Sequence, residues 1–328
     1  MEKRKLQRTG GSSFSLTLPK EWVSRFALTS QDIVHVVPQK TGTLVVSPAS
    51  LKALSAKTTL MIDGFSKDQL IREFIAVYVA GFDEVTIKAK KFTTDQRAAI
   101  RLLPQYLIGF EIIDESSEMM VFKNIFDASK LPIPKSIEKM FTIVQSMFDD
   151  ALMAVSNHDA GLAKDVQERD FEVDKLHLFL TRQLHSLLQD KISEQHVGLD
   201  RLDLYFFQTV ALQLERIADH AVKIALVGVL QAKKPEKALV SAYHKVTEKL
   251  LMLLRTSGEM VRKLDRKQAH AILDMNPSLE KLIHSQSSDH AKSAVGVLIA
   301  DSLDRLRGYI MNIAEAVIDQ SLARQIWQ

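Results

Sequence analysis

The spacing of hydrophobic and polar residues changes twice along the chain and divides it into three segments. Residues 1–48 contain short stretches in which apolar residues alternate with polar ones, the pattern of half-buried strands. Residues 57–127 alternate between strand-like and helix-like stretches, and residues 134–325 are helical throughout. The sequence therefore predicts a multidomain protein: a small β-hairpin domain, a small α/β domain and an all-α domain.

The first segment predicts four short strands and one short helix. The strands are KRKLQR, SFSLTL, DIVHVVP and TLVVSP; Gly10-Gly11 turns between the first two, PKEWVSRF forms the helix, and QKTG joins the last two. Strands this short cannot bury a core by themselves, so we expect two copies of the chain to interlock as a homodimer.

The middle segment, residues 57–127, reads strand, helix, strand, helix and a final hairpin. Asp68 and Asp95 lie near helix starts, and Gly81 and Gly109 near helix ends. The segment has neither a glycine-rich phosphate loop nor a nucleophile elbow, so we assign it no chemistry. A role as connector or ligand sensor is a hypothesis.

The third segment follows a linker, Ser129–Pro134, and predicts two successive sets of three helices. The expected helices are Lys135–Asn157, Ala160–Gln189, Leu199–Gln231, Lys237–Leu264, Lys267–Ser285 and Lys292–Gln320.

The third of these helices carries two carboxylates, Glu215 and Asp219, one turn apart on the flank of an apolar stripe. Such a pair destabilises an exposed helix by about 0.2–0.5 kcal/mol, so stability alone does not favour it. The alternative to a binding site is a solvated flank that Arg216, Lys223 or a neighbouring helix neutralises.

The second helix carries a matching pair, Asp170 and Asp174. The midpoint between Asp170 and Glu215 falls between residues 192 and 193, inside the polar connection DKISEQHVG. In an antiparallel helix pair, residues at equal distances from the connection lie at the same level. The two carboxylate pairs are therefore expected to lie side by side. Four carboxylates repel strongly unless a cation binds, and an all-oxygen set suits magnesium, manganese, calcium or iron.

Composition limits where the protein can be located and which kinds of site it can contain. The 328 residues are 46% hydrophobic and 25% charged, with no apolar run near the ~18 residues that span a bilayer and no signal-peptide core after the charged start. We expect a cytoplasmic protein without membrane insertion. The absence of cysteine excludes disulfides, thiolate metal sites and cysteine nucleophiles.

The net charge of +3 is concentrated at the start, where residues 1–48 hold seven Lys or Arg against three Asp or Glu. Here RKLQRTGGSSFSLTLPKEW followed by LTSQDIVHVV resembles the swapped-hairpin DNA-binding domain of the AbrB family, over about 45 residues. Gln31 departs from the glycine that usually precedes the aspartate. The resemblance implies an intertwined dimer that presents basic residues to DNA: Lys3, Arg4, Lys5, Arg8, Lys20 and Arg25.

Clustered cations, doubled by dimerisation, can neutralise phosphates and release counterions. A basic solvated face on a module that serves dimerisation alone is the alternative.

In the helical segment, ERDFEVDKL followed by LERIADHAVKIA resembles the paired acidic motifs of the PhoU family, over roughly residues 134–325. The resemblance implies a double three-helix bundle with metal ions, often iron or zinc clusters, at Asp170, Asp174, Glu215 and Asp219. It also implies regulation of phosphate uptake together with phosphate transporters and sensor kinases. An AbrB-like domain ahead of a PhoU-like bundle resembles the archaeal phosphate uptake regulators.

The second set of helices repeats the pattern with fewer charges. Asn276 and Glu280 correspond to the first pair, Asp304 to Glu215, and Gly308 to Asp219. Because two carboxylates that face an asparagine and a glycine form a poorer cation site, we predict one metal centre, in the first set.

The leading hypothesis is a non-enzymatic, DNA-binding regulator of phosphate uptake. The second is an accessory protein of a phosphate transporter, and the third a metal-storage protein or metal-dependent enzyme. Di-iron oxidases use Glu-x-x-His on two helices, whereas here the single analogue is Asp174 with His177, which we interpret as a helix-surface histidine. His220 points about 100° away from Asp219. We see no set of nucleophile, base and orienting group, and assign no catalytic residue.

Overall fold

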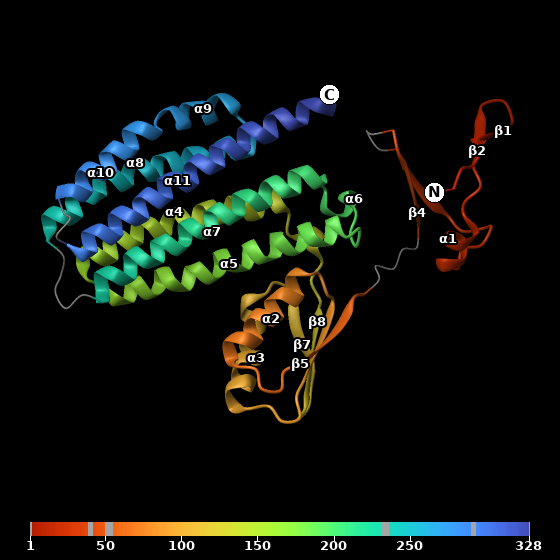
Figure 1. Cartoon of the computed structure of the whole chain (residues 1–328), viewed down its shortest axis with the longest axis horizontal. Helices are drawn as coiled ribbons and strands as arrows, with labels where there is room; N and C mark the ends of the chain where they lie inside the picture. Colours follow the sequence, from red (N-terminus) through yellow and green to blue (C-terminus); the bar gives the residue numbers. More distant parts are fainter. Residues whose placement is uncertain (1, 39–41, 50–54, 231–235, 290–292, 328) are drawn as a thin grey trace. The chain divides into compact units, whose positions relative to one another are not determined.

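The computed structural model describes residues 2–38, 42–49, 55–230, 236–289 and 293–327. It divides into two compact units, Met1–Leu54 and Ser55–Ile326 (Figure 1). No helix among the described residues is long and apolar enough to cross a membrane.

The first unit contains two hairpins and one short helix. Its elements are β1 (Gln7–Thr9), β2 (Ser13–Ser15), α1 (Lys20–Arg25), β3 (Val34–Pro38) and β4 (Leu44–Pro48). The pairs β1–β2 and β3–β4 are antiparallel and form separate two-stranded sheets. All four predicted strands are present, but the first two are shorter than predicted, and Lys3–Lys5 lies before β1. Most of the predicted QKTG turn, residues 39–41, lies outside the described residues.

The first unit lacks a core of its own. Among its described residues Pro48 alone is buried, whereas Leu6, Phe14 and Ile33 are 68%, 67% and 73% exposed. Asp32 closes the turn at Gln31, because its Oδ2 accepts the Thr29 N–H at 2.6 Å and the Thr29 hydroxyl at 2.9 Å. The local geometry of the unit is therefore satisfied, but its apolar side chains need another surface to cover them.

The second unit begins with the predicted α/β layer. It comprises β5 (Lys57–Met61), α2 (Lys67–Val79), β6 (Glu84–Lys88), α3 (Thr94–Tyr106), β7 (Phe110–Glu115) and β8 (Met119–Asn124). The strand order is β5-β6-β8-β7, with β5 parallel to β6 and the other pairs antiparallel. Apolar residues of both helices and of the sheet form one core, which includes Phe74, Tyr78, Leu103 and Phe122.

Local sequence signals explain where these helices begin and end. The Ser66 and Thr93 hydroxyls cap α2 and α3 by accepting backbone N–H groups of the first turn. Gly81 and Gly109, predicted to lie near helix ends, adopt φ of +89° and +88°, values that favour glycine. At Gly109 a Cβ would also lie 2.4 Å from the Cβ of Phe126, so a side chain does not fit there.

The remaining chain is helical, as predicted. The helices are α4 (Ile133–Asn157), α5 (Ala160–Leu188), α6 (Glu194–Val197), α7 (Arg201–Leu230), α8 (Lys237–Lys263), α9 (Arg266–Asp274), α10 (Asn276–Asp289) and α11 (Ala294–Ala323), with 3-10 turns at Ala128–Lys130 and Arg324–Trp327. The linker is shorter than predicted, because α4 begins at Ile133.

One helix boundary was predicted wrongly. The single helix expected over Lys267–Ser285 is interrupted at Met275 and forms α9 and α10. Pro277 lies in the first turn of α10, where its missing N–H is harmless, whereas inside a continuous helix it would remove a hydrogen bond. The predicted ends at Gln231 and Lys292 lie outside the described residues.

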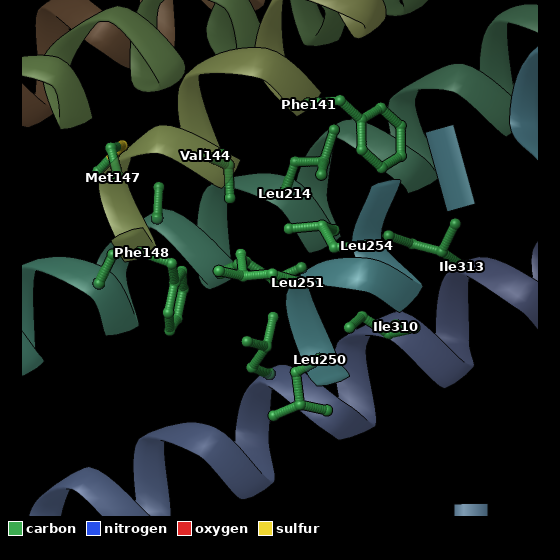
Figure 2. Packing of buried hydrophobic residues seen from close by; sticks show 14 of the residues in the cluster. Phe141, Val144, Met147, Phe148, Leu214, Leu250, Leu251, Leu254, Ile310 and Ile313 are labelled. Atoms are coloured by element: carbon green, nitrogen blue, oxygen red, sulfur yellow. The ribbon is translucent and has the colours of Figure 1, made fainter. Parts of the chain in front are cut away.

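The two sets of helices share one continuous core rather than forming two separate ones. Apolar side chains of α4, α7, α8 and α11 meet between the sets, among them Phe148, Leu214, Leu250 and Ile310 (Figure 2). The side-chain amide of Asn312 also donates to Oε1 of Gln213 at 3.0 Å and so links α11 to α7. The helical part is therefore one packed body.

The α/β layer packs on α5 through a buried arginine. Arg182 of α5 donates to the Tyr78 carbonyl at 2.6 Å and to the Asp83 carboxylate at 3.0 Å. Its guanidinium lies 5.0 Å from the ring centroid of Tyr78 and 5.3 Å from that of Phe110. Since the side chain is 5% exposed, this arginine connects the core of the α/β layer to the helical body.

Candidate metal centre

The apolar stripe predicted for α7 is fully buried, which places the two carboxylates of this helix at its edge. The stripe consists of Leu214, Ile217, Ala218, Ala221, Ile224 and Ala225, each 0% exposed. Glu215 lies half-buried beside it and Asp219 is exposed. The flank position deduced from the helical period is confirmed.

The helix α5 packs along α7 and presents Asp170 and Asp174 beside its own buried stripe, in which Val166, Val173 and Leu180 are all 0% exposed. Both carboxylates are half-buried. The Asp170 Oδ1 atom is buried without a hydrogen-bond partner among the described residues.

The four carboxylates come close enough to interact. Burial, followed by the charges of Asp174, Asp219 and Glu215, raises the pKa of Asp170 to about 7. Burial and then Asp219 raise the pKa of Asp174 to about 6. For Glu215, burial, Asp219 and Asp174 raise the pKa to about 7 against the opposing effect of Arg216 and Lys223. The matching heights deduced from the connection are therefore confirmed.

Among the described residues, no basic side chain forms a direct pair with this cluster. None of the four carboxylates forms a hydrogen bond or ion pair through its side chain within the described part of the chain. Arg169, next to Asp170, binds the carboxylates of Asp150 and Asp165 at 2.6 and 2.7 Å. Arg216 lies over the ring of Tyr309 at 5.9 Å. The alternative to a site, a solvated flank neutralised by Arg216, Lys223 or a neighbouring helix, is met in part, because Arg216 and Lys223 lower the pKa of Glu215 without pairing with it and Asp219 is exposed.

The chemistry of these donors fits a hard cation, because all four are oxygen ligands that repel each other when ionised. In the present side-chain positions, however, no three His, Asp or Glu side chains among the described residues are grouped so that they could hold a metal ion. Metal binding here therefore requires the side chains to rotate toward a common centre.

Comparison with known proteins bears on this helix pair. Residues 137–227 match the PhoU domain. The match contains all four carboxylates but covers less than a third of the chain. No curated protein matches the sequence.

One solved structure supports the fold of the helical part. The crystal structure of PhoU from Pseudomonas aeruginosa is similar with a TM-score of 0.51 and 16% identity, over 60% of this chain and 99% of that chain. The phosphate transport system regulatory protein PhoU from Streptococcus pneumoniae gives a TM-score of 0.49 and 16% identity, over 58% and 94%. Only the first reaches a score on which we base the fold, and the helical part is thus PhoU-like.

The second half of the PhoU-like body contains an arginine where the first half has unpaired carboxylates. Arg307 donates to Asp304 at 2.8 Å and also to the Asn276 side-chain oxygen. Asn276 and Asp304, which the sequence placed opposite each other, therefore meet through this guanidinium. Glu280 is exposed, and the space beside Gly308 is open. The arginine, three residues after Asp304, could have been recognised in the sequence as the internal cation.

The two histidines of the first half differ in position. His177 is half-buried and its Nε2 is buried without a partner among the described residues, so it is less exposed than the helix-surface histidine that we expected. Burial and then Arg216 lower its pKa. His220 is 7% exposed and lies against Tyr309 of α11, with ring centroids 5.9 Å apart. It faces away from the carboxylates, as its position one residue after Asp219 predicts.

The six predicted DNA-binding residues are all exposed. Lys20 and Arg25 begin and end α1, and Arg8 lies in β1. The other three, Lys3, Arg4 and Lys5, precede the first strand. Two of the six are partly engaged, because Arg4 pairs with Glu2 at 2.6 Å and Arg8 donates to the Gly11 carbonyl at 2.6 Å. The PhoU domain match does not extend to this unit.

Proposed function

We propose that this chain is a non-enzymatic regulator of phosphate uptake, with one metal centre in its PhoU-like body and a DNA-binding dimer formed by residues 1–48. The observation that carries the proposal is the cluster of four carboxylates without a basic partner, inside the stretch that matches the PhoU domain. The PhoU family, whose acidic helix motifs these residues resemble, regulates phosphate uptake.

At the metal centre, Asp170 and Asp174 would bind a cation from α5, and Glu215 and Asp219 from α7. A bound cation would supply the positive charge that offsets their mutual repulsion. Iron, zinc, manganese and magnesium are the candidate ions, of which the hard ones suit the oxygen donors best. In the second half Arg307 already provides this charge, so we expect no metal there.

The proposal that the first unit binds DNA rests on its exposed cations and uncovered apolar strands. A second copy of the unit would cover side chains such as Phe14 and Ile33, and would double the number of basic residues facing the phosphates. The resulting affinity depends on counterion release, so it must fall steeply as salt rises.

A pull-down of fragmented genomic DNA by the full chain tests the regulatory role. We expect enrichment of fragments that lie upstream of phosphate-uptake genes, and loss of this enrichment when Lys3, Arg4 and Lys5 are all changed to Gln. As a matched control, the surface residues Lys135, Lys139 and Lys164 of the helical part are changed in the same way and should leave DNA binding intact. Failure to retain duplex DNA even at low salt would refute this role.

The second candidate is an accessory protein of a phosphate transporter, in which residues 1–48 serve dimerisation alone. The lack of a core in the first unit favours it equally, because dimerisation accounts for the exposed strands without DNA. Co-purification with transporter components that persists in the Lys3, Arg4 and Lys5 variant, together with no DNA binding by the parent chain, would favour this candidate.

A further inference from the structure

His177 lies on the same face of α5 as two of the proposed metal ligands. Each residue advances about 100° around a helix, which places His177 about 20° from Asp170 and about 60° from Asp174. Side chains on a helix lean toward its N-terminus, so the imidazole leans over the turn that begins at Asp174. The helix therefore brings a nitrogen donor beside two carboxylates.

Electrostatic interactions across the helix pair place His177 at one end of the carboxylate cluster. After burial, the charge of Arg216 is the second cause that lowers the pKa of His177. The same charge opposes the rise that burial and Asp219 cause in the pKa of Glu215. Because Arg216 directly follows Glu215 on α7, we infer that His177 lies near the level of Glu215.

The imidazole of His177 is held without a hydrogen bond at the atom that would bind a ligand. Its Nε2 is buried and has no partner among the described residues. The same is true of Oδ1 of Asp170, which lies two turns away on the same helix face. Buried polar atoms are normally paired, so each of these two is an exception that a binding role explains.

A nitrogen donor changes which ions a site prefers. Four carboxylates offer oxygen alone, which suits magnesium and calcium as well as manganese and iron. Imidazole nitrogen suits iron and zinc, whereas magnesium is usually bound by carboxylate and water oxygens. One histidine beside the carboxylates would therefore favour a transition metal over magnesium.

We propose that His177 is a fifth ligand of the metal centre and binds the ion through Nε2, so that the site selects iron or zinc over magnesium. The inference rests on the metal centre proposed above. As for the carboxylates, binding requires the side chain to rotate toward the common centre, and a change of rotamer leaves the backbone of α5 in place. The carboxylates supply the negative charge, and the imidazole supplies the selectivity.

Calorimetric titration of the full chain with Zn²⁺ and with Mg²⁺ tests the selectivity. We expect His177→Gln to weaken zinc binding at least about tenfold and to change magnesium binding by less than about twofold. The matched control is His185→Gln, because His185 is also half-buried on α5 but lies about 12 Å further along the helix. It should bind both ions as the parent chain does.

Three results of this titration would overturn the proposal. They are unchanged zinc affinity in His177→Gln, an equal loss in His185→Gln, and a loss for magnesium as large as that for zinc. The last of these would assign His177 a structural role.

Pulsed electron paramagnetic resonance of the chain loaded with Mn²⁺ identifies the donor directly. The echo should be modulated by the nitrogen nucleus of a bound imidazole in the parent chain and in His185→Gln, but not in His177→Gln. Asp170→Asn separates this inference from the metal centre on which it rests. If Asp170→Asn weakens Mn²⁺ binding but the parent chain shows no nitrogen modulation, the centre stands and His177 is not a ligand. If the parent chain binds no Mn²⁺, both proposals fail.

Discussion

Asp170, Asp174 and Glu215 have raised pKa values because the folded protein buries them close to each other. A carboxyl with a raised folded-state pKa holds its proton more tightly when folded than when unfolded. Its contribution to stability is therefore fully present below the unfolded pKa and is lost as pH rises through the folded value. For Asp170 and Glu215 this window runs from about 4 to about 7.

The metal-free protein should thus become less stable between pH 5 and pH 8. In the presence of a chelator we expect the melting temperature to fall over this interval, and Asp170→Asn to melt higher than the parent chain at pH 8. Thermal unfolding followed by circular dichroism measures both. A variant that melts at or below the parent temperature at pH 8 would mean that the carboxylates do not repel each other in the folded chain.

Metal and protons compete for the same oxygens, which gives a second prediction at this scale. A divalent cation such as Mn²⁺ should raise the melting temperature more at pH 8 than at pH 5, because fewer protons must be displaced. The matched variant Asp304→Asn should show the same response as the parent chain, since Arg307 already pairs with Asp304. An equal shift at both pH values would argue against binding at these carboxylates.

At the scale of elements, α5 connects the carboxylate cluster to the α/β layer. Its residue Phe171, next to Asp170, lies edge-on to Tyr106 of α3 at 5.6 Å, and Arg182 is buried against Tyr78. One helix thus contacts the core of the layer on one side and carries two proposed metal ligands on another.

Removal of the buried guanidinium should destabilise the packing of the α/β layer on α5 without affecting the proposed metal site. Arg182→Met removes one of the two donors to the Tyr78 carbonyl, which keeps the Gly81 N–H, and removes the ion-pair partner of Asp83, which keeps the Ala56 N–H. Because Asp83 is about one-third exposed, we expect a loss of about 2 kcal/mol rather than the full cost of a buried pair. Denaturant unfolding measures the loss, and metal content is the control that should stay unchanged. A variant as stable as the parent chain would contradict the role assigned to Arg182.

Periodicity predicted most elements of the second unit well, because the repeats are strong, and α2 and α3 also carry the start signals Asp68 and Asp95 in their first turns. The same rules allowed the carboxylate pairs to be aligned, since a hairpin of two long helices fixes which residues share a height. The break at Met275 was missed because apolar residues keep the helical spacing across Pro277, and the proline acts through a backbone hydrogen bond that the side-chain pattern does not contain.

The prediction was less accurate for residues 1–48. Their alternation predicted the strands, but β1 and β2 span three residues each, because little in the described chain packs against them. Likewise the burial of His177 and the contacts of Arg182 depend on how the α/β layer and α7 pack against α5. Such contacts between distant segments leave no local pattern in the sequence.

At the scale of the whole molecule, the first unit requires a partner surface, and a second copy of the chain is the proposed one. Light scattering coupled to gel filtration should show a dimer for residues 1–328 and a monomer for residues 55–328. The shortened chain should keep its helical circular dichroism, because its cores lie within Ser55–Ile326. A monomeric full chain, or a dimer that persists after removal of the first unit, would refute this role.

The central claim is a single metal centre formed by the carboxylates of α5 and α7. Elemental analysis of the purified full chain, at neutral pH and after removal of loosely bound ions, tests it most directly. We expect metal in the parent chain and in Asp304→Asn, and a loss of most of it in Asp170→Asn and Asp219→Asn, all with unchanged helical content. Equal metal content in all four proteins, or a loss confined to Asp304→Asn, would contradict the claim.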